Sequence, residues 1–461
     1  MVDRLGPVRT FREIRRDFDP LVLVLATGDL VASFGFALVF PFLSIYLVEQ
    51  LGASAVEAGL VLAGYSVCSI FSGVAGGWLA DRVGRRPVMI VSVGLTAVIV
   101  ALMGRAPDLQ TIAALTMILG LVDPAFVPAA RAAIADVVPV ERRPRAYGLL
   151  NVAFAVGWIV GPAVGAGLST LGYGLLFTVS GAFIGAYAVI AFVWLRETLP
   201  AKQRSPRDAR PTEAAREAVA PGATLQSAGT GPSGSGPAGL APLGSAPSGT
   251  TTAGSVAADD PSLARARVRA FMTFLPIAVA VHGTIFLWVA VLPIHASRDF
   301  GVATGAWGLL FSLNGLMIVL FQLRISSAIE GRPKARIMAT AVLVYAIGML
   351  VVSALGTPLP ALPALAVAIV LFTIGEMLLF PTEPAFISDL SPVDRRGRYQ
   401  GIFLAATGLG TALGPPLGGF VIDAAPGPPL WVVAAGVFLV AGAALAVLDR
   451  RTRLLPAAAD G

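Results

Sequence analysis

Twelve long apolar runs follow one another along this chain of 461 residues. An α-helix of about 20 predominantly apolar residues crosses the hydrocarbon core of a bilayer, and each run is close to or above that length. Only 13% of the residues are charged, against about 25% in a soluble domain. We therefore predict an all-α integral membrane protein. Its spans are expected near residues 21–48, 55–79, 87–104, 109–135, 145–169, 175–195, 270–294, 305–327, 335–355, 361–387, 398–422 and 430–448.

A duplicated stretch divides the chain into two copies. Residues 134–165 recur without a gap as residues 387–418, an offset of 253 positions (387 − 134), and 13 of the 32 aligned residues are identical. A period this long is too large for a solenoid. Each copy holds six of the predicted spans, so we expect two pseudo-symmetric six-helix bundles with the same orientation in the membrane.

The composition changes sharply between the sixth and seventh spans. Residues 197–262 are dominated by Gly, Ser, Pro, Ala and Thr, a composition that cannot bury enough apolar surface to fold. The predicted domains are therefore an N-terminal bundle over residues 1–196, a flexible linker over 197–262 and a C-terminal bundle over 263–461.

Basic residues gather in alternate loops and at both termini, whereas the opposite face carries only Arg105 and Arg298. Loops rich in Lys and Arg remain in the cytoplasm, so we predict that these loops, the linker and both termini are cytoplasmic. The net charge of +6 is then a topology signal, and no nucleic-acid partner is expected.

The loop after the second span, residues 77–89, has the sequence GWLADRVGRRPVM. It resembles the signature loop of the major facilitator superfamily in its residues Gly77, Asp81, Arg82, Gly84, Arg85 and Arg86. Gly77 would permit close helix approach, and Gly84 would permit a turn with positive φ. Asp81 could accept hydrogen bonds from arginines or from helix N-terminal amides of the other half, forming a cytoplasmic latch that opens and closes with the transport cycle. A solvated loop without this role is the alternative.

Glycines recur every fourth residue in the fifth span and again in its copy. They are Gly157, Gly161 and Gly165 beside Pro162, and Gly410, Gly414 and Gly418 beside Pro415. Such a face lets helices pack closely, and the proline creates a kink site. The pattern resembles the fifth-helix motif of drug:proton antiporters within the same superfamily. The resemblance points to antiport, and generic helix packing is the alternative.

We single out five ionisable residues inside the predicted spans: Asp29 in the first, Asp123 in the fourth, His282 in the seventh, and Glu376 and Glu383 in the tenth. The other eight spans have charged residues only near their ends. A charged residue at the centre of a span costs roughly 2.5–3.5 kcal/mol or more, so an idle one is unfavourable. In the fold that the sequence resembles, helices 1, 4, 7 and 10 line the central cavity, and these are the four spans that carry the residues.

The repeat register makes Asp123 and Glu376 equivalent, because they are also 253 positions apart (376 − 123). A carboxyl group in a low-dielectric cavity can carry a proton near neutral pH. We therefore predict Asp123 and Glu376 as the proton-exchanging pair and Asp29 as a third proton or substrate-cation site. Structural roles stay open for these acids, as do a packed neutral side chain for His282 and an ion pair with cytoplasmic arginines for Glu383.

One departure from the family pattern affects the proton route. Antiporters of this family often bury an arginine in the fourth helix, but residues 111–128 contain none. The route must therefore depend on the carboxylates. The sequence shows no phosphate-binding loop, metal-ligand cluster or nucleophile–base pair, so neither a cofactor nor an enzymatic activity is expected.

The resemblance implies a transporter of two six-helix bundles that rock about a central site, driven by the proton gradient. Buried acids without buried basic partners favour a positive substrate. We therefore predict proton-coupled efflux of small lipophilic or cationic compounds across a bacterial cell membrane, by a monomer. One rival is a proton-coupled importer of a metabolite on the same fold. Another is a non-transporting membrane sensor or lipid-handling protein, in which the carboxylates would be dispensable.

Overall fold

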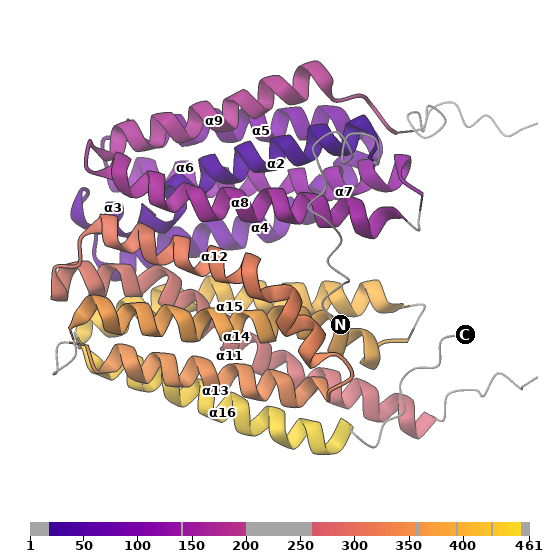
Figure 1. Ribbon diagram of the computed structural model, residues 1–461, viewed down its shortest axis with the longest axis vertical. Coiled ribbons are helices and arrows are strands. Elements are labelled where there is room, and N and C mark those ends of the chain that lie inside the picture. Colours follow the sequence, from indigo (N-terminus) through magenta and orange to yellow (C-terminus); the bar gives the residue numbers. More distant parts are fainter. Residues whose placement is uncertain are drawn as a thin grey trace, which may run out of the picture.

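The computed structural model describes residues 18–139, 142–199, 261–355, 360–392, 395–425 and 427–452. Within these ranges every regular element is a helix (Figure 1). Twelve helical segments are long and apolar enough to cross a membrane, which confirms the twelve predicted spans. Both chain termini and residues 200–260 of the predicted linker lie outside the described ranges.

The N half contains the first six spans. The first is α2 (Pro20–Val39), η1 (Phe40–Phe42) and α3 (Leu43–Glu49), followed by α4 (Ala55–Val83) and α5 (Arg85–Met103). The fourth is α6 (Leu109–Val122), η2 (Asp123–Ala125) and α7 (Phe126–Val137), followed by α8 (Arg143–Ser169) and α9 (Tyr173–Trp194). Within this half α2 packs on α8 and α9, and α5 packs on α9.

The C half contains the other six spans, each a single helix. They are α11 (Pro261–Phe300), α12 (Thr304–Ile329), α13 (Lys334–Ser353), α14 (Ala361–Leu390), α15 (Arg396–Ala424) and α16 (Pro428–Thr452). Here α11 packs on α15, and α13 packs between α14 and α16. Figure 1 shows the two halves stacked against each other, with α4, α8, α12 and α15 nearest the seam.

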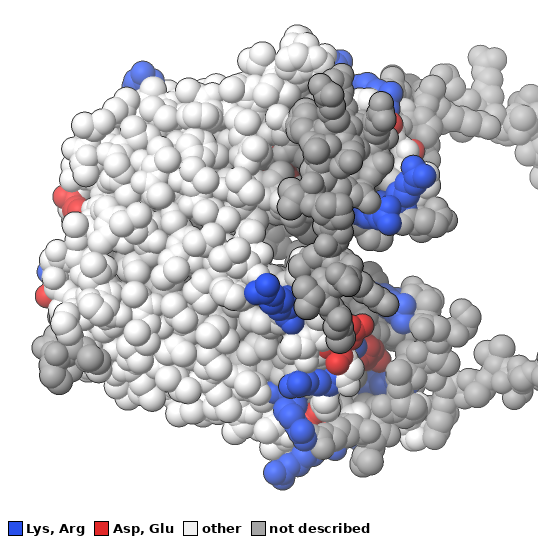
Figure 2. All heavy atoms as spheres, in the orientation of Figure 1, with Lys and Arg blue, Asp and Glu red and all other residues white. Residues whose placement is uncertain are grey.

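Charged side chains are concentrated at the ends of the helices. Figure 2 shows a wide uncharged zone between them, with most of the visible Lys and Arg at one end of the molecule. We call this the arginine-rich end, defined by the α4–α5, α7–α8, α12–α13 and α14–α15 connections. Large apolar side chains cover the outer surface between the ends, such as Val189 of α9 at 62% exposure and Val440 of α16 at 71%. Such a surface suits lipid and not water.

The two halves are in closest contact away from the arginine-rich end. A Cβ atom on Gly59 of α4 would lie 2.6 Å from the Pro415 carbonyl carbon of α15. One on Gly308 of α12 would lie 2.4 Å from the Pro162 carbonyl oxygen of α8. Both approaches lie in the parts of these helices far from the arginines. At the arginine-rich end the outline is notched between the halves (Figure 2). The structure is therefore a conformer that opens toward the arginine-rich end.

Local sequence explains where several helices begin. Ser54 and Glu57 form a capping box at the start of α4, in which the Glu57 carboxylate accepts from the Ser54 amide at 2.8 Å. Asp108 accepts from the Thr111 amide at 2.7 Å at the start of α6. The Asp108 pKa lies below its ordinary value because these backbone hydrogen bonds stabilise the ionised form.

Candidate functional site

Asp123 lies at a break in the fourth span. Pro124 lacks an amide hydrogen and cannot continue the α-helical ladder, so residues 123–125 form a short 3-10 segment between α6 and α7. The Ser92 hydroxyl of α5 donates to the Val122 carbonyl at 2.8 Å, which satisfies a backbone group near the break. The break therefore holds the Asp123 side chain in a fixed place within the bundle.

The Asp123 carboxylate accepts a hydrogen bond from the Tyr65 hydroxyl of α4 at 3.4 Å. It faces a cavity of about 180 Å³ inside the N half, and Asp29 of α2 faces the same cavity. The remaining lining side chains are apolar, aromatic or hydroxyl-bearing: Ala32, Ser33, Phe36, Tyr65, Val93, Thr96, Phe126, Val127, Phe154, Trp158, Ile184 and Tyr187. We call this space the N-half pocket.

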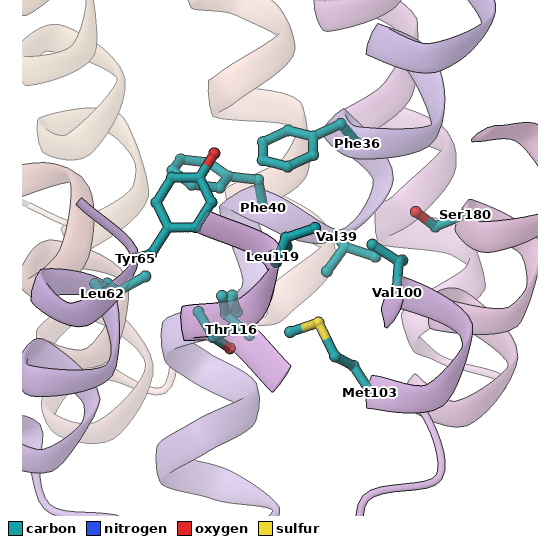
Figure 3. A pocket seen from close by; sticks show the side chains of 11 residues that line it. Phe36, Val39, Phe40, Leu62, Tyr65, Val100, Met103, Thr116, Leu119 and Ser180 are labelled. Atoms are coloured by element: carbon teal, nitrogen blue, oxygen red, sulfur yellow. The ribbon is translucent and has the colours of Figure 1, made fainter. Parts of the chain in front are cut away.

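A smaller apolar recess adjoins the N-half pocket. It measures about 20 Å³ and shares Phe36 and Tyr65 with the larger cavity. Figure 3 shows the Tyr65 hydroxyl directed away from Met103 and Thr116, on the side of the ring where Phe36 lies. The Tyr65 ring thus lines the apolar recess, while its hydroxyl donates a hydrogen bond to Asp123. The wall between the two spaces is aromatic.

The electrostatics of the N-half pocket favour a cation. Two carboxyl groups face it, and its described lining includes no lysine, arginine or histidine. Arg131 of α7 is exposed and near enough to Asp29 to attract its charge, but it is not part of the lining. Aromatic faces attract cations through the ring quadrupole. Carboxylates among aromatic walls therefore provide charge attraction and aromatic contact for a positively charged group.

Glu376 has a different environment from its sequence mate Asp123. It lies in the unbroken helix α14, and it accepts a hydrogen bond from the Asn314 amide of α12 at 3.0 Å. Asn314 also donates to the Thr373 hydroxyl at 2.9 Å. Asp123 and Glu376 are thus hydrogen-bonded within separate halves. Their role as a proton-exchanging pair stays a prediction.

Glu383 is buried between α14 and α11, where its carboxyl oxygen lies 3.5 Å from His282 Nε2. His282 Nδ1 lies 3.1 Å from the Ala278 carbonyl oxygen one turn earlier in α11. The ring of Phe380 stacks near His282 at 6.1 Å between centroids. The structure thus pairs Glu383 with a histidine, where the sequence had left open an ion pair with an arginine.

The two glycine motifs pack the fifth span on the first and the eleventh on the seventh. A Cβ atom on Gly161 of α8 would lie 2.6 Å from the Ala37 Cβ of α2. On Gly414 of α15 it would lie 2.0 Å from the Gly283 carbonyl oxygen of α11. The partner helices are those that carry Asp29 and His282. The sequence predicted close packing, and the structure shows that it fixes two helices with buried ionisable residues.

The loop predicted over residues 77–89 is almost entirely helical, because α4 continues to Val83, α5 begins at Arg85 and only Gly84 connects them. This connection is held by contacts within its own half. Gly84 has a φ of +122°, in the region that favours glycine. Arg85 binds the Asp81 carboxylate at 2.7 Å and lies 3.3 Å from the Asp136 carboxylate of α7. The Glu197 carboxylate accepts from the Arg85 amide at 3.0 Å. In this conformer Asp81 thus contacts its own half, which fits a latch that engages only in the other conformer.

Polar contacts join the halves at the end opposite the arginines. Asp423, at the end of α15, accepts a hydrogen bond from the Val56 amide in the first turn of α4 at 3.0 Å. It also pairs with Arg298 at 3.4 Å. The Ser297 hydroxyl donates to Glu49 across the same seam. A carboxylate at a helix N-terminus is favoured by the free amides and the helix dipole, so Asp423 stabilises this closed end.

Replacing Asp423 by alanine is therefore expected to shift the conformational balance toward opening at this end. The loss of a carboxylate at a helix N-terminus costs about 0.3–1 kcal/mol, and up to about 2 kcal/mol when partly buried. Distances between spin labels at the exposed positions Val83 and Leu404 should shorten as the arginine-rich end closes. Asp81→Asn should shift the balance in the opposite sense. Unchanged label distances in the Asp423 variant would contradict this assignment.

Sequence reasoning missed most of the pocket wall. Tyr65, Phe126, Trp158 and Tyr187 come from four different spans and carry no motif. The sequence did contain one local signal, Pro124, which directly follows Asp123 and accounts for the break there. Among the described residues no group of three or more His, Cys, Asp or Glu could hold a metal ion.

The fold agrees with comparisons to known proteins. The sequence profile of the Major Facilitator Superfamily matches residues 25–291 and, in a second overlapping match, residues 273–460. The chain therefore belongs to this superfamily. It is a multi-pass membrane protein and a secondary transporter of small molecules, not an enzyme.

Two curated relatives indicate how far sequence similarity extends. The uncharacterized MFS-type transporter YqjV of Bacillus subtilis is 24% identical over 447 residues, which are 95% of this chain and 96% of that protein. The multidrug resistance protein MdtG of Yersinia enterocolitica is 34% identical over 180 residues, which are 37% of this chain and 42% of MdtG. The second match is closer but covers less than half of either protein.

Solved structures share the architecture. A POT family transporter superposes with a TM-score of 0.72 at 14% identity, covering 93% of this chain and 96% of that one. The nucleoside transporter NupG superposes with a TM-score of 0.69 at 13% identity, covering 93% of this chain and 98% of that one. At these identities the likeness supports the fold and not the substrate.

Proposed function

We propose that this protein exports small lipophilic cations in exchange for protons. The observation that carries the proposal is the N-half pocket, where Asp29 and Asp123 face one cavity among aromatic walls without a basic lining residue. A metabolite carrying carboxylate or phosphate groups would be repelled there. A cation with an apolar body would gain charge attraction, aromatic contact and apolar burial together.

The size of the N-half pocket limits what enters it. A cavity of about 180 Å³ is smaller than the roughly 300–1,000 Å³ of a site that encloses a drug-sized ligand. The pocket therefore takes the cationic end of a substrate. The remainder of the substrate would extend past Phe154 and Trp158 of α8, which adjoins the seam between the halves.

The proposed direction of transport is export from the cytoplasm. The positive-inside rule favours a cytoplasmic location for the basic loops of the arginine-rich end, and the present conformer would then be open to the cytoplasm. Positively charged compounds would load from that side and leave when the halves close there and open at the other end. The relatives named multidrug resistance protein MdtG support export. We take one chain, in the bacterial cell membrane, as the transporting unit.

The proposal is tested with the purified protein in liposomes under an imposed pH gradient. A lipophilic cation should accumulate in the acidic compartment, with protons moving the opposite way, and a neutral analogue of equal size should not accumulate. Cation and proton moving in the same direction would favour the importer. Preference for an anionic or zwitterionic metabolite would overturn the substrate class.

A further inference from the structure

We propose that His282 and Glu383 hold one transferable proton between them, at a site in the C half that is separate from the N-half pocket. The inference deepens the proposed function and depends on it for its role in transport. It assigns the coupling proton to the α11–α14 interface and leaves the N-half pair, Asp29 and Asp123, to the substrate.

The hydrogen bond to Ala278 fixes the state of the histidine ring. His282 Nδ1 lies 3.1 Å from the Ala278 carbonyl oxygen, and a carbonyl oxygen only accepts. Nδ1 must therefore carry a hydrogen. The opposite ring nitrogen, Nε2, faces the Glu383 carboxyl oxygen at 3.5 Å. The protonation states of this pair therefore differ only at Nε2 and at that carboxyl oxygen.

A proton count follows from this geometry. If Glu383 is neutral, its hydroxyl donates to the lone pair on Nε2. If Glu383 is ionised, Nε2 carries the hydrogen and donates to the carboxylate. Both arrangements contain one proton between the two atoms. Removing that proton would leave a buried carboxylate facing a lone pair, which is costly in apolar surroundings.

The surroundings isolate the pair from water. The side chains of His282 and Glu383 are 11% and 4% exposed. Phe380 stacks on one face of the imidazole at 6.1 Å, and Phe403 of α15 meets it edge-on at 6.0 Å. The helices packed around the pair also carry titratable groups. Those nearest the pair include Glu376 of α14 and Tyr345 of α13, which is near both glutamates, and Lys334 of α13 is bound to Asp389 at the arginine-rich end.

The Phe380 side chain lies between the His282–Glu383 pair and the exposed surface of α14, so it controls the access of water to the pair. It lies one helical turn after Glu376 on the same face of α14, and it is 41% exposed. A change of its rotamer would hydrate His282 without moving α11. The backbone of α11 is held against α15 at Gly283, where a Cβ on Gly414 would lie 2.0 Å away. The side chain can therefore gate a pair whose backbone is fixed.

If the proton site and the cation site are separate, a variant can lose pH-driven accumulation of the cation and still exchange labelled for unlabelled cation. Net accumulation driven by a pH gradient requires the pair to gain and lose its proton. Exchange of labelled for unlabelled cation requires only the N-half pocket and the conformational change. Coupling then arises because both sites bias the same conformational equilibrium, and not because cation and proton compete for one carboxylate.

The test uses Glu383→Gln in the full-length protein, because glutamine can donate to Nε2 but cannot lose a proton. We expect at least a tenfold loss of pH-driven cation accumulation, with cation binding and labelled exchange kept within about twofold of wild type. Glu330→Gln, an exposed acid in the same half, is the matched control and should behave as wild type. Wild-type pH-driven accumulation in Glu383→Gln would overturn the proposal, as would loss of binding in the folded variant.

A readout independent of transport separates this proposal from the proposed function. Difference infrared spectra across a pH titration should contain a protonated-carboxyl or imidazolium signal that disappears in Glu383→Gln and changes in His282→Asn. Its presence in a wild-type protein that moves no cation would contradict the proposed function alone. Unchanged spectra in both variants would contradict the proton pair.

Discussion

Replacing Asp123 by asparagine is expected to reduce proton-driven export of a lipophilic cation by about thirtyfold or more. The carboxylate faces the N-half pocket and is held by Tyr65 at 3.4 Å, so asparagine keeps the shape and removes the charge. Truncating one partner of a buried charge pair costs about 2–5 kcal/mol, and each 1.4 kcal/mol is a factor of about ten. Cation binding measured by equilibrium dialysis should weaken in parallel.

Two further variants make this expectation specific. Asp123→Glu keeps the charge and should retain more binding than Asp123→Asn. The double variant Asp29→Asn/Asp123→Asn should lose less than the sum of the two single losses, because both side chains face one ligand. Full additivity, or wild-type binding in Asp123→Asn with a normal fold, would show that the cation binds elsewhere.

Replacing Gly414 by alanine is expected to destabilise the protein more than any other single methyl group added to the glycine motifs. The new Cβ would lie 2.0 Å from the carbonyl oxygen of Gly283, a backbone atom of α11. Overpacking costs about 1–3 kcal/mol in a well-packed core and sometimes more, and here no flexible side chain can yield. The melting temperature in detergent and the yield of folded protein should both fall.

The same helix provides the control. Gly401 lies in α15 with nothing within 4 Å of its added Cβ, so Gly401→Ala should stabilise by up to about 1 kcal/mol through helix propensity. Gly161→Ala should fall between the two, since its Cβ meets the Ala37 side chain at 2.6 Å. A melting temperature for Gly414→Ala at or above that of Gly401→Ala would refute close packing of α11 and α15.

The sequence predicted the twelve spans because apolar length is a local property. The arrangement of charged residues by span was equally visible. What it did not reveal is which side chains converge. Trp158 and Tyr187 line the same cavity as Asp123 because α8 and α9 pack around α2, and no spacing along one helix encodes that arrangement.

The repeat register aligns two positions whose local structures differ. It equates Asp123 with Glu376, yet Pro124 breaks the helix at the first and Met377 lets it continue at the second. One acid consequently faces a cavity while the other accepts from Asn314. Duplication conserves the backbone plan, whereas single neighbouring residues decide the local chemistry.

The contacts of Glu197 have a mechanical consequence. This residue follows the last transmembrane helix of the N half, and it is where the chain departs toward the other half. Its carboxylate is bound by the Arg85 and Arg86 amides, and the next residue, Thr198, donates to Asp136 at 3.0 Å. Because of these contacts, a force on the chain that follows Glu197 would act on the amino end of α5 as well as on the end of α9. The connection to the other half therefore starts from a residue that is bound to the amino end of α5, four residues after Asp81.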